Sequence, residues 1–393
     1  MLKDKNILYI VHKYNSFQKD PIEEAAKYFN KVYVLVRYKP ISSIIKYLPM
    51  KWLKVFDESI VIDLRGLPQN VEVIKTPVWY LPFGFLNRWL GDLHFRSVAR
   101  VISKQEIKFD IIHSHFIWSS GYVGMKLKEK YNVPLVVTGH GFDVYRLPFK
   151  DDYWREKIQE IINSADKILT VSEFNKKHLL KLHIPDRKIS IVHNGYSTEN
   201  FSPQSRDNAR KDLGIDTGRK ICVSVGNLEK VKGFDILIKA IGELTENGFD
   251  IECYIIGDGS QGNKLRELIS KLRLEDRVFL VGFKPHDQVG KWINSADLFV
   301  ISSRIESASV VLLEALACGK PVVATEVGIV PLVLKTDCGI IVKAKTPHEL
   351  GISIKDALGR EWDSAKITKC ASTFSWENSV RQIIDIYKIL LND

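Results

Sequence analysis

The stretch DLFVISSRIESASVVLLEALACGKPVVAT, residues 297–325, contains a complete strand–helix–strand unit. Apolar runs of strand length open and close it at 297–302 and 321–325, and a helical pattern begins between them near Val310. Continuous Val/Ile/Leu strands that alternate with helices are typical of parallel sheets covered on both faces. The stretch therefore predicts an α/β fold.

The same alternation runs along the whole chain of 393 residues and restarts near residue 220. The expected strands are 6–11, 32–36, 110–115, 134–138, 167–171 and 189–192 in the first half, and 220–225, 250–256, 277–282, 297–302, 321–325 and 339–342 in the second. Helix-like stretches include 21–29, 122–131, 154–164 and 375–391.

The chain is too long for one core, because single cores seldom grow past about 250–300 residues. We therefore predict two doubly wound, Rossmann-like domains, 1–197 and 198–375, with the polar stretch 197–220 as the linker region. The last helix, 376–393, could pack back on the first domain. Ligands of such sheets bind outside the carboxyl ends of the strands, so a cleft between the two domains is the expected site.

The positive charge of the chain is concentrated in its first half. Residues 1–195 carry 31 Lys and Arg against 20 Asp and Glu, a net charge of +11, whereas 196–393 carry 26 against 27. A basic half suggests an anionic partner, although a solvated lysine-rich surface explains it equally well. No two of the five cysteines have C-x-x-C spacing, which argues against a zinc site or a disulfide framework. The apolar run 7–11 is too short for a signal peptide or a membrane span, so we expect a cytoplasmic protein.

The segment YIIGDGSQGN, residues 254–263, contains the G-x-G-x-x-G pattern of dinucleotide-binding loops. That pattern belongs after the first strand of its unit, with an acidic residue ending the next strand. Here it follows the second strand, and the next strand ends in Gly282-Phe283-Lys284. We therefore do not expect NAD.

Two carboxylates, Glu306 and Glu314, flank the small residues Ser307, Ala308 and Ser309 ahead of the predicted helix. Free backbone amides at a helix N-terminus suit an anion. A carboxylate on each side of an anion site would repel the anion. The arrangement makes sense if the ligand also carries hydroxyl groups for the carboxylates to bind, as a sugar nucleotide does. A solvated loop with a glutamate in the first helical turn explains these residues equally well.

The spacing of Glu306 and Glu314 resembles the E-x7-E signature of the retaining glycosyltransferases of family 4, the group 1 family with the GT-B fold. The resemblance extends over most of the chain, in order and spacing. It is carried by IIHSHFIWSSGYVG (111–124), VVTGHGFDVY (136–145), VSEFNKKHLL (171–180), ISIVHNGYSTENF (189–201), VGNLEKVKGFDILIKAI (225–241), YIIGDGSQGNKL (254–265) and EDRVFLVGFKPHDQV (275–289).

The resemblance implies the roles of individual residues. Glu306 would lie near the transferred sugar, Lys232 would neutralise the diphosphate, and His140 would bond a sugar hydroxyl group, these three being the catalytic set. Glu314 would bind the ribose hydroxyl groups. The remaining donor-binding positions are Gly226, Asn227, Gly257, Gly259, Phe283, Lys284, Ser307, Ala308, Ser309, Val310 and Val311, of which the glycine loop and 282–284 would receive the base.

The resemblance also implies the reaction. It is the transfer of a hexose from a nucleotide-diphosphate sugar to a glycan or lipid-linked acceptor, with retention at the anomeric carbon and the donor phosphate accepting the proton. No D-x-D motif occurs, so we expect neither metal nor cofactor. The family often has arginine where Asn227 stands, and Ser307 and Ser309 replace its usual glycines. The glycine-rich turn after the first strand is replaced by HKYNSFQKDP (12–21).

Acceptor binding is expected in the first domain, and no nucleic acid is expected. Two stretches, 38–56 and 78–95, mix aromatic with basic residues, as segments at a membrane interface do. They suggest a peripheral contact with an anionic membrane surface at its inner face, although ordinary packing in the cleft wall and core explains them slightly better. The competing functions are a nucleotide-sugar epimerase of the same fold and a non-catalytic sugar-nucleotide-binding protein.

Overall fold

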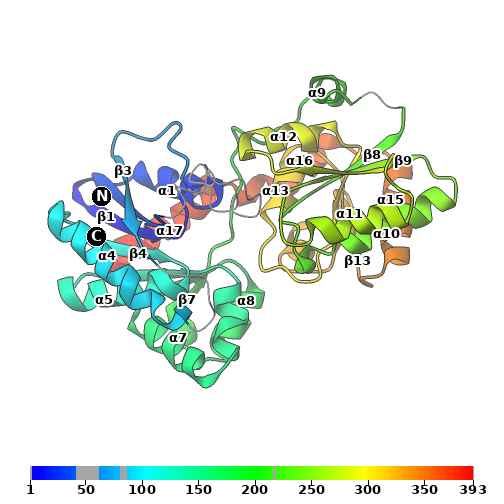
Figure 1. The fold of residues 1–393 in the computed structure, drawn as a ribbon. Helices are drawn as coiled ribbons and strands as arrows, with labels where there is room; N and C mark the ends of the chain where they lie inside the picture. Colours follow the sequence, from blue (N-terminus) through cyan, green and yellow to red (C-terminus); the bar gives the residue numbers. More distant parts are fainter. Residues whose placement is uncertain (1, 41–61, 80–85, 216–217, 393) are drawn as a thin grey trace. The chain divides into compact units, whose positions relative to one another are not determined.

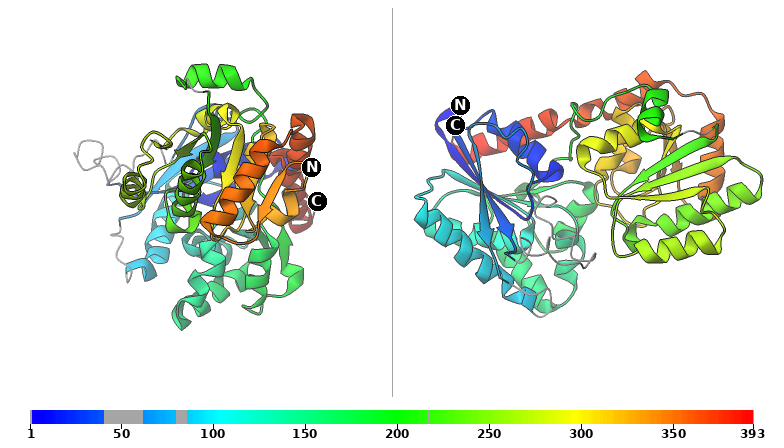
Figure 2. Two further views of the ribbon diagram at one scale, coloured as in Figure 1. Left: turned by 90° about the vertical axis from the view of Figure 1, so that its right-hand side faces the viewer. Right: turned by 45° about the horizontal axis from the view of Figure 1, so that its top comes forward.

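The structure is a computed structural model, and it describes residues 2–40, 62–79, 86–215 and 218–392. The chain forms two compact units: unit 1 comprises Met1–His193 and Trp376–Asp393, and unit 2 comprises Asn194–Ser375. The division after His193 precedes the boundary that we predicted after residue 197. Each unit is a parallel sheet with helices on both faces (Figures 1 and 2).

Unit 1 contains a seven-stranded sheet in the order β3-β2-β1-β4-β5-β6-β7, with every neighbouring pair parallel. The strands are β1 (Asn6–Val11), β2 (Lys31–Tyr38), β3 (Val71–Pro77), β4 (Ile111–His115), β5 (Leu135–Gly139), β6 (Lys167–Thr170) and β7 (Ile189–Ile191). The α-helices are α1 (Ser16–Ala26), α4 (Leu90–Lys104), α5 (Tyr122–Tyr131), α6 (Phe142–Tyr145), α7 (Asp152–Ser164), α8 (Glu173–Leu180) and α17 (Trp376–Leu391).

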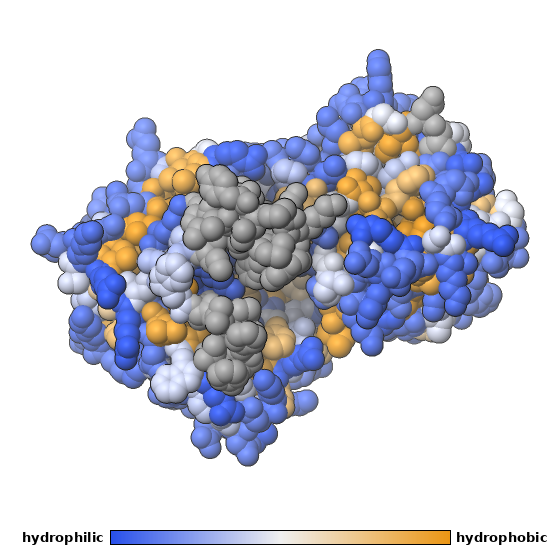
Figure 3. Space-filling model, viewed as in Figure 1, coloured by the Kyte–Doolittle hydropathy of each residue, from blue (hydrophilic) through white to orange (hydrophobic). Residues whose placement is uncertain are grey.

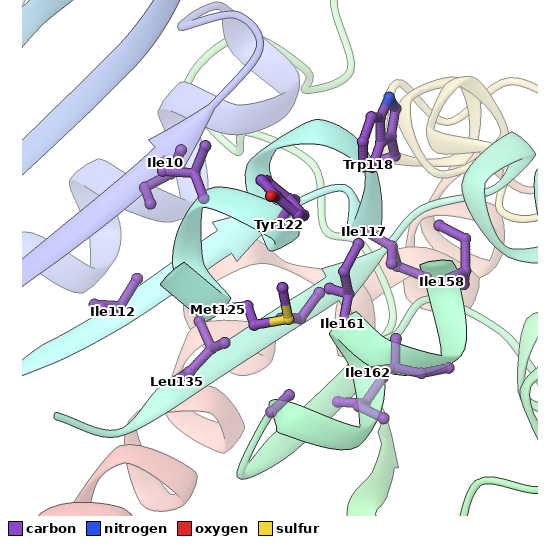
Figure 4. Close-up of a cluster of buried hydrophobic side chains, with 14 of the residues drawn as sticks. Ile10, Ile112, Ile117, Trp118, Tyr122, Met125, Leu135, Ile158, Ile161 and Ile162 are labelled. Atoms are coloured by element: carbon purple, nitrogen blue, oxygen red, sulfur yellow. The ribbon is translucent and has the colours of Figure 1, made fainter. Parts of the chain in front are cut away.

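Successive side chains of β1 enter two different cores of unit 1. Leu8 and Ile10 join a cluster under α4, α5 and α7, which Figure 4 shows with Ile112, Met125 and Ile161 packed together. Their neighbours along the strand face the opposite core, under α1 and α17. Because both faces of a central parallel strand are buried, its sequence is a continuous apolar run instead of an alternating one.

The C-terminal helix α17 packs on the sheet of unit 1 beside α1 (Figure 1). Val380, Ile384 and Tyr387 are its buried contacts in this core. Tyr387 is fully buried, and its hydroxyl lies 3.1 Å from the hydroxyl of Tyr9 on β1. The last residues of the chain therefore complete the core that its first strand begins.

Unit 2 contains a six-stranded sheet in the order β10-β9-β8-β11-β12-β13, again parallel throughout. The strands are β8 (Lys220–Val225), β9 (Ile251–Ile256), β10 (Val278–Gly282), β11 (Leu298–Ile301), β12 (Val322–Thr325) and β13 (Gly339–Val342). The α-helices are α9 (Arg206–Leu213), α10 (Phe234–Glu246), α11 (Gly262–Lys271), α12 (His286–Ser295), α13 (Val310–Ala317), α14 (Val330–Val333), α15 (Pro347–Gly359) and α16 (Ser364–Ala371).

Three local features differ from the sequence-based expectation. The edge strand β3, VEVIKTP, was not expected, because its polar residues interrupt the apolar run. Helix α1 begins at Ser16 instead of residue 21, because the carbonyl of Asn15 already accepts from the amides of Gln18 and Lys19. The predicted linker region contains α9, which is held to unit 2 by ion pairs of Arg206 and Arg210 with Asp297.

In the part of the chain that the structure describes, no helix combines the length and the apolar character needed to cross a membrane. On the face drawn in Figure 3, hydrophilic residues predominate and apolar ones occur in small groups. The segment 41–61, which covers most of the predicted interfacial stretch 38–56, lies outside the described residues, as does 80–85 within the stretch 78–95.

Candidate functional site

The segments that leave the centre of the unit 2 sheet carry an ion pair. β8 and β11 are neighbours in the sheet but not along the chain, and this switch in strand order is where such sheets bind ligands. Lys232 follows β8, and its Nζ donates to Oε1 of Glu306, which follows β11, over 2.5 Å. Ser303 Oγ donates to the same oxygen over 2.9 Å. The sequence predicted both charged residues as catalytic, and the fold brings them together.

Gly233 allows these two segments to touch. It has a φ of +66°, and a Cβ added there would lie 2.0 Å from the carbonyl oxygen of Ser302. Ser302 Oγ in turn donates to the carbonyl of Lys232 over 3.0 Å. Only glycine combines this φ with so close an approach at low cost. The position of Lys232 beside Glu306 therefore depends on the residue that follows it.

The glycine loop after β9 packs against the backbone of the loop after β8. A Cβ on Gly257, whose φ is +144°, would lie 2.0 Å from the Gly226 carbonyl oxygen, and one on Gly259 would lie 2.7 Å from that of Leu228. The Leu228 amide donates to the Asp258 carbonyl over 2.9 Å. These contacts account for the first two glycines of the pattern without a dinucleotide.

Glu314, the second carboxylate of the motif, lies in the interior of unit 2. It is 2% exposed on α13, and its Oε1 lies 2.7 Å from Nε2 of His286 at the start of α12. The ring of His286 also contacts Phe201 at 4.9 Å between centroids. This histidine holds a carboxylate that the sequence predicted as a ribose ligand.

The small residues ahead of α13 form the N-terminal end of that helix, which begins at Val310. The amides of Val310 and Val311 belong to its first turn, where amides have no acceptor within the helix. Ser309 is 2% exposed and its Oγ has no partner among the described residues. Ser307 is buried and Ala308 half-buried. The loop thus offers donors beside Glu306 and Glu314.

The predicted base-binding residues are more exposed to solvent than Glu314 and Ser309. Phe283 is 54% exposed after β10, and Asn227 is exposed after β8, whereas Lys284 and Gly226 are half-buried. The amide of Gly257 donates to the Gly282 carbonyl over 3.0 Å, which ties these loops together. All these residues lie at the carboxyl-end edge of the same sheet.

His140 lies in unit 1, after β5. Its Nε2 is 3.1 Å from Nδ1 of His115, while its Nδ1 is buried and has no partner in the part of the chain that the structure describes. Burial lowers the pKa of His140 well below that of a free imidazole. Asp143 fixes the turn by accepting from the amides of Gly141 and Ile117, each over 2.9 Å.

Residues without a predicted role support this turn from within the core of unit 1. His113 Nδ1 lies 2.5 Å from the Tyr387 hydroxyl, and its Nε2 lies 2.7 Å from Thr138 Oγ1. Burial lowers the pKa of His113, and burial lowers that of His115 to about 3. His286 and Ser303 in unit 2 were missed in the same way. Their types carry no motif, and only the fold reveals their partners.

Within the described residues, one group of three side chains has the geometry to hold a metal ion: Asp337, Cys338 and Cys370. Cys338 directly precedes β13, at the amino-end edge of the sheet. The ion pair of Lys232 and Glu306 lies at the carboxyl-end edge. Burial raises the pKa of the Cys338 thiol to about 12, which disfavours the thiolate that metals bind. The absence of a catalytic metal stays a prediction.

The sequence matches two known families. Residues 205–372 match the family described as glycosyl transferases group 1, and residues 59–200 match glycosyltransferase family 4. A D-inositol 3-phosphate glycosyltransferase of Mycolicibacterium smegmatis is 31% identical over 303 residues, 72% of this chain and 68% of that protein. An uncharacterized glycosyltransferase of Methanocaldococcus jannaschii is 28% identical over 72% of this chain and 76% of that protein.

Solved structures share the whole fold. A sucrose-phosphate synthase of Thermosynechococcus elongatus superposes with a TM-score of 0.79 at 19% identity, covering 99% of this chain and 100% of that one. The Anabaena protein HepE, solved in complex with UDP and glucose, superposes with a TM-score of 0.72 at 19% identity, covering 98% and 99%. The two parallel sheets are those of the GT-B fold, as the sequence predicted.

Proposed function

This chain belongs to the group 1 glycosyltransferases, and from that premise we propose that it is a retaining, metal-independent enzyme. It moves a hexose from a nucleotide-diphosphate sugar to a glycan or lipid-linked acceptor. The observation that carries the proposal is the ion pair of Lys232 and Glu306 at the strand-order switch of unit 2, beside the start of α13.

Lys232 stabilises the leaving diphosphate. An ammonium group has three donors, so its Nζ can keep its bond to Glu306 and donate to a phosphate oxygen. Negative charge grows on the diphosphate as its bond to the sugar breaks, and a fixed cation stabilises that charge most where it develops. The amides of Val310 and Val311 add donors at the positive end of the α13 dipole. Together these groups replace a bridging metal ion.

The two carboxylates bind hydroxyl groups of the donor. Glu314, held by His286, takes the ribose pair, and Glu306, held by Lys232 and Ser303, takes hydroxyl groups of the hexose. Nδ1 of His140, buried and without a partner in the described part of unit 1, takes a further sugar hydroxyl. The exposed Phe283, with Lys284 and the glycine loop, receives the base.

The chemical step is a displacement on one face of the sugar. The acceptor oxygen forms its bond to the anomeric carbon on the side from which the diphosphate leaves, so the configuration is retained. The acceptor proton passes to the departing phosphate oxygen. Protein groups orient the reactants and balance charge, and no carboxylate forms a covalent intermediate.

The relatives support this reading over the alternatives. Those named above are glycosyltransferases, which favours transfer over sugar epimerisation or binding without catalysis. The complexes of the Anabaena protein with UDP, glucose and UDP-glucose favour a nucleotide sugar as the donor.

Transfer assays on single variants test the proposal. Glu306→Gln and Lys232→Ala are expected to slow transfer about 100- to 1,000-fold, as is typical when one preorganised electrostatic contact is removed. Lys264→Ala, an exposed lysine on α11, is the matched control and keeps full activity. NMR of the product gives the anomeric configuration. An inverted product, or full activity in Glu306→Gln, contradicts the proposal.

We also propose that unit 1 contacts an anionic membrane surface, at the inner face of the membrane. Trp79 is 70% exposed and Trp89 is 65% exposed, and the Arg88 side chain beside Trp89 is half exposed. Exposed indoles with basic neighbours suit the headgroup region. Flotation with anionic vesicles at low salt should recover the protein, and the double variant Trp79→Ala/Trp89→Ala should float less. Equal recovery with neutral vesicles, or none at all, contradicts this contact.

A further inference from the structure

The carboxyl-end edge of the unit 1 sheet gathers basic and hydrogen-bond-donating side chains from neighbouring strands. Arg37 lies near the end of β2, His12 directly follows β1, and Ser119 lies shortly after β4. These three strands are adjacent in the order β2-β1-β4. The first turn and a half of α4 adds His94. The switch in strand order between β1 and β4, the expected ligand position of this unit, thus lies within the group.

Three of these residues form a continuous hydrogen-bonded chain. Arg37 Nη1 donates to Ser119 Oγ over 3.0 Å, and Ser119 Oγ lies 3.0 Å from Nδ1 of His94. Ser119 and His94 are fully buried. When the Ser119 hydroxyl donates its hydrogen bond to Nδ1 of His94, the neutral imidazole carries its own proton on Nε2. That nitrogen is buried and has no partner among the described residues.

Further buried polar atoms of the same segments also lack partners within the described ranges. They are Nε2 of His12, Nε1 of Trp118 and Oγ of Ser120. Figure 4 shows the ring nitrogen of Trp118 directed away from the aliphatic side chains of the core. Buried polar groups in proteins are nearly always hydrogen-bonded. A fold that needed only packing here would use apolar side chains, so these atoms point to a bound molecule.

The charges of the group favour an anion. Burial and then the nearby charge of Arg37 lower the pKa values of His12 and His94, so both imidazoles are neutral at neutral pH and the guanidinium is the charged member. Nearby carboxylates are already engaged: Asp92 accepts from the Tyr122 hydroxyl over 2.6 Å, and Asp143 accepts from backbone amides. A permanent cation linked to neutral hydrogen-bonding groups matches the planar, multidentate recognition of phosphate.

We propose that Arg37, Ser119, His94 and His12 form a binding site for a phosphate monoester carried by the acceptor. The inference rests on the proposed function, because it names the chemical class of the acceptor that unit 1 receives. The phosphate anchors the molecule at Arg37 and leaves one of its hydroxyl groups to react. A soluble phosphorylated polyol and a lipid with a phosphate monoester headgroup share this chemistry.

Calorimetric titration of the full chain tests the site. The soluble probes are D-inositol 3-phosphate and inositol, and the lipid probe is phosphatidate in neutral vesicles. We expect the phosphorylated polyol to bind at least about tenfold more tightly than inositol, since one hydrogen bond to a charged group is typically worth a factor of about ten or more in affinity. Arg37→Gln should remove this preference, and Arg37→Lys should restore part of it.

The control variant is Arg100→Gln, which removes an equal charge from the exposed face of α4 and should keep the preference. Binding of phosphatidate vesicles but not of the soluble ester, again lost in Arg37→Gln, identifies the lipid source and supports the site. Equal affinity for the phosphorylated and plain polyol, or a preference that survives Arg37→Gln, overturns the inference.

Titration with UDP, GDP and ADP separates this result from the proposed function, because the donor residues other than His140 lie in unit 2. Arg37→Gln should bind its nucleotide as the unaltered chain does. Transfer to a phosphorylated acceptor at an unchanged rate in Arg37→Gln overturns the phosphate site alone. Failure to bind or use any nucleotide sugar overturns the proposed function instead.

Discussion

At the carboxyl ends of its strands, unit 2 pairs its charges, whereas unit 1 buries neutral histidines. In unit 2, Lys232 is bound to Glu306 and Arg304 to Asp235, both at 2.7 Å or less. In unit 1, three buried and two half-buried histidines have lowered pKa values: His94, His113 and His115, and His12 and His140. The same sheet topology thus supports two kinds of surface, one suited to a charged donor and the other to a separate ligand.

The largest expected difference between the two units is their loss of stability in acid. Burial lowers the pKa of His115 from 6.5 to about 3, so between these values the unfolded chain binds more protons than the folded one. Stability is therefore lost as pH falls below 6.5, at about 1.4 kcal/mol per pH unit for this residue. The other four histidines of this group act in the same direction. Hydrogen exchange measured by mass spectrometry at pH 7, 6 and 5 should show unit 1 losing protection before unit 2.

Two variants test whether the buried histidines cause this acid sensitivity. His115→Leu should reduce the acid sensitivity of unit 1, while His183→Asn, at an exposed position with positive φ, should leave it unchanged. Unit 2 opening first in acid would contradict the difference that we draw between the units.

The second-largest effect on stability is expected where two backbone segments of unit 2 are in close contact. Gly233→Ala places a Cβ 2.0 Å from the Ser302 carbonyl oxygen at a φ of +66°, so we expect it to lower the free energy of unfolding of unit 2 by about 3 kcal/mol or more. Gly248→Ala has a similar φ of +77° but meets nothing within 4 Å, and should cost about 1 kcal/mol. Denaturant titration compares them, and equal losses would show that φ alone matters.

The smallest effect is expected at the buried end of α17. Tyr387→Phe removes the hydroxyl that contacts His113 at 2.5 Å and Tyr9 at 3.1 Å. We expect unit 1 to lose about 1–3 kcal/mol, the cost of leaving a buried partner unsatisfied. Tyr33→Phe on β2 is the control and should be near neutral. If unit 2 is destabilised as much as unit 1, the assignment of α17 to unit 1 is wrong.

The regular parts of the fold were predictable because buried parallel strands are continuous apolar runs. Every expected strand is present at its predicted place within a few residues. The missed strand β3 lies at the edge of its sheet, where polar residues are tolerated. Helix α9 was not predicted because Ala209 is its one buried residue, so its sequence has no helical period of apolar residues. Ion pairs such as that of Arg210 with Asp297 hold it to unit 2.

The residues of the two sites could likewise be predicted only where they belong to a sequence motif. Lys232, Glu306 and Glu314 stand in recognisable motifs, and the fold joins two of them in an ion pair. His286 contacts Glu314 from another helix, 28 residues away along the chain, which no local pattern indicates. Ser303 lies in the same loop as Glu306, three residues before it, but a serine at that spacing is not specific to any site. The group around Arg37 and His94 combines residues of β2, of α4 and of the segments after β1 and β4, which only the topology brings together.

The proposed function requires that unit 2 bind the diphosphate of a nucleotide sugar through Lys232. Calorimetric titration of the full chain with UDP-, GDP- and ADP-sugars, beside NAD as a negative control, tests it most directly. We predict that at least one nucleotide sugar binds, that NAD does not, and that Lys232→Ala weakens the binding about tenfold or more, as is expected when a charged hydrogen bond is lost. Heat with none of the sugars, or equal affinity in Lys232→Ala, would contradict it.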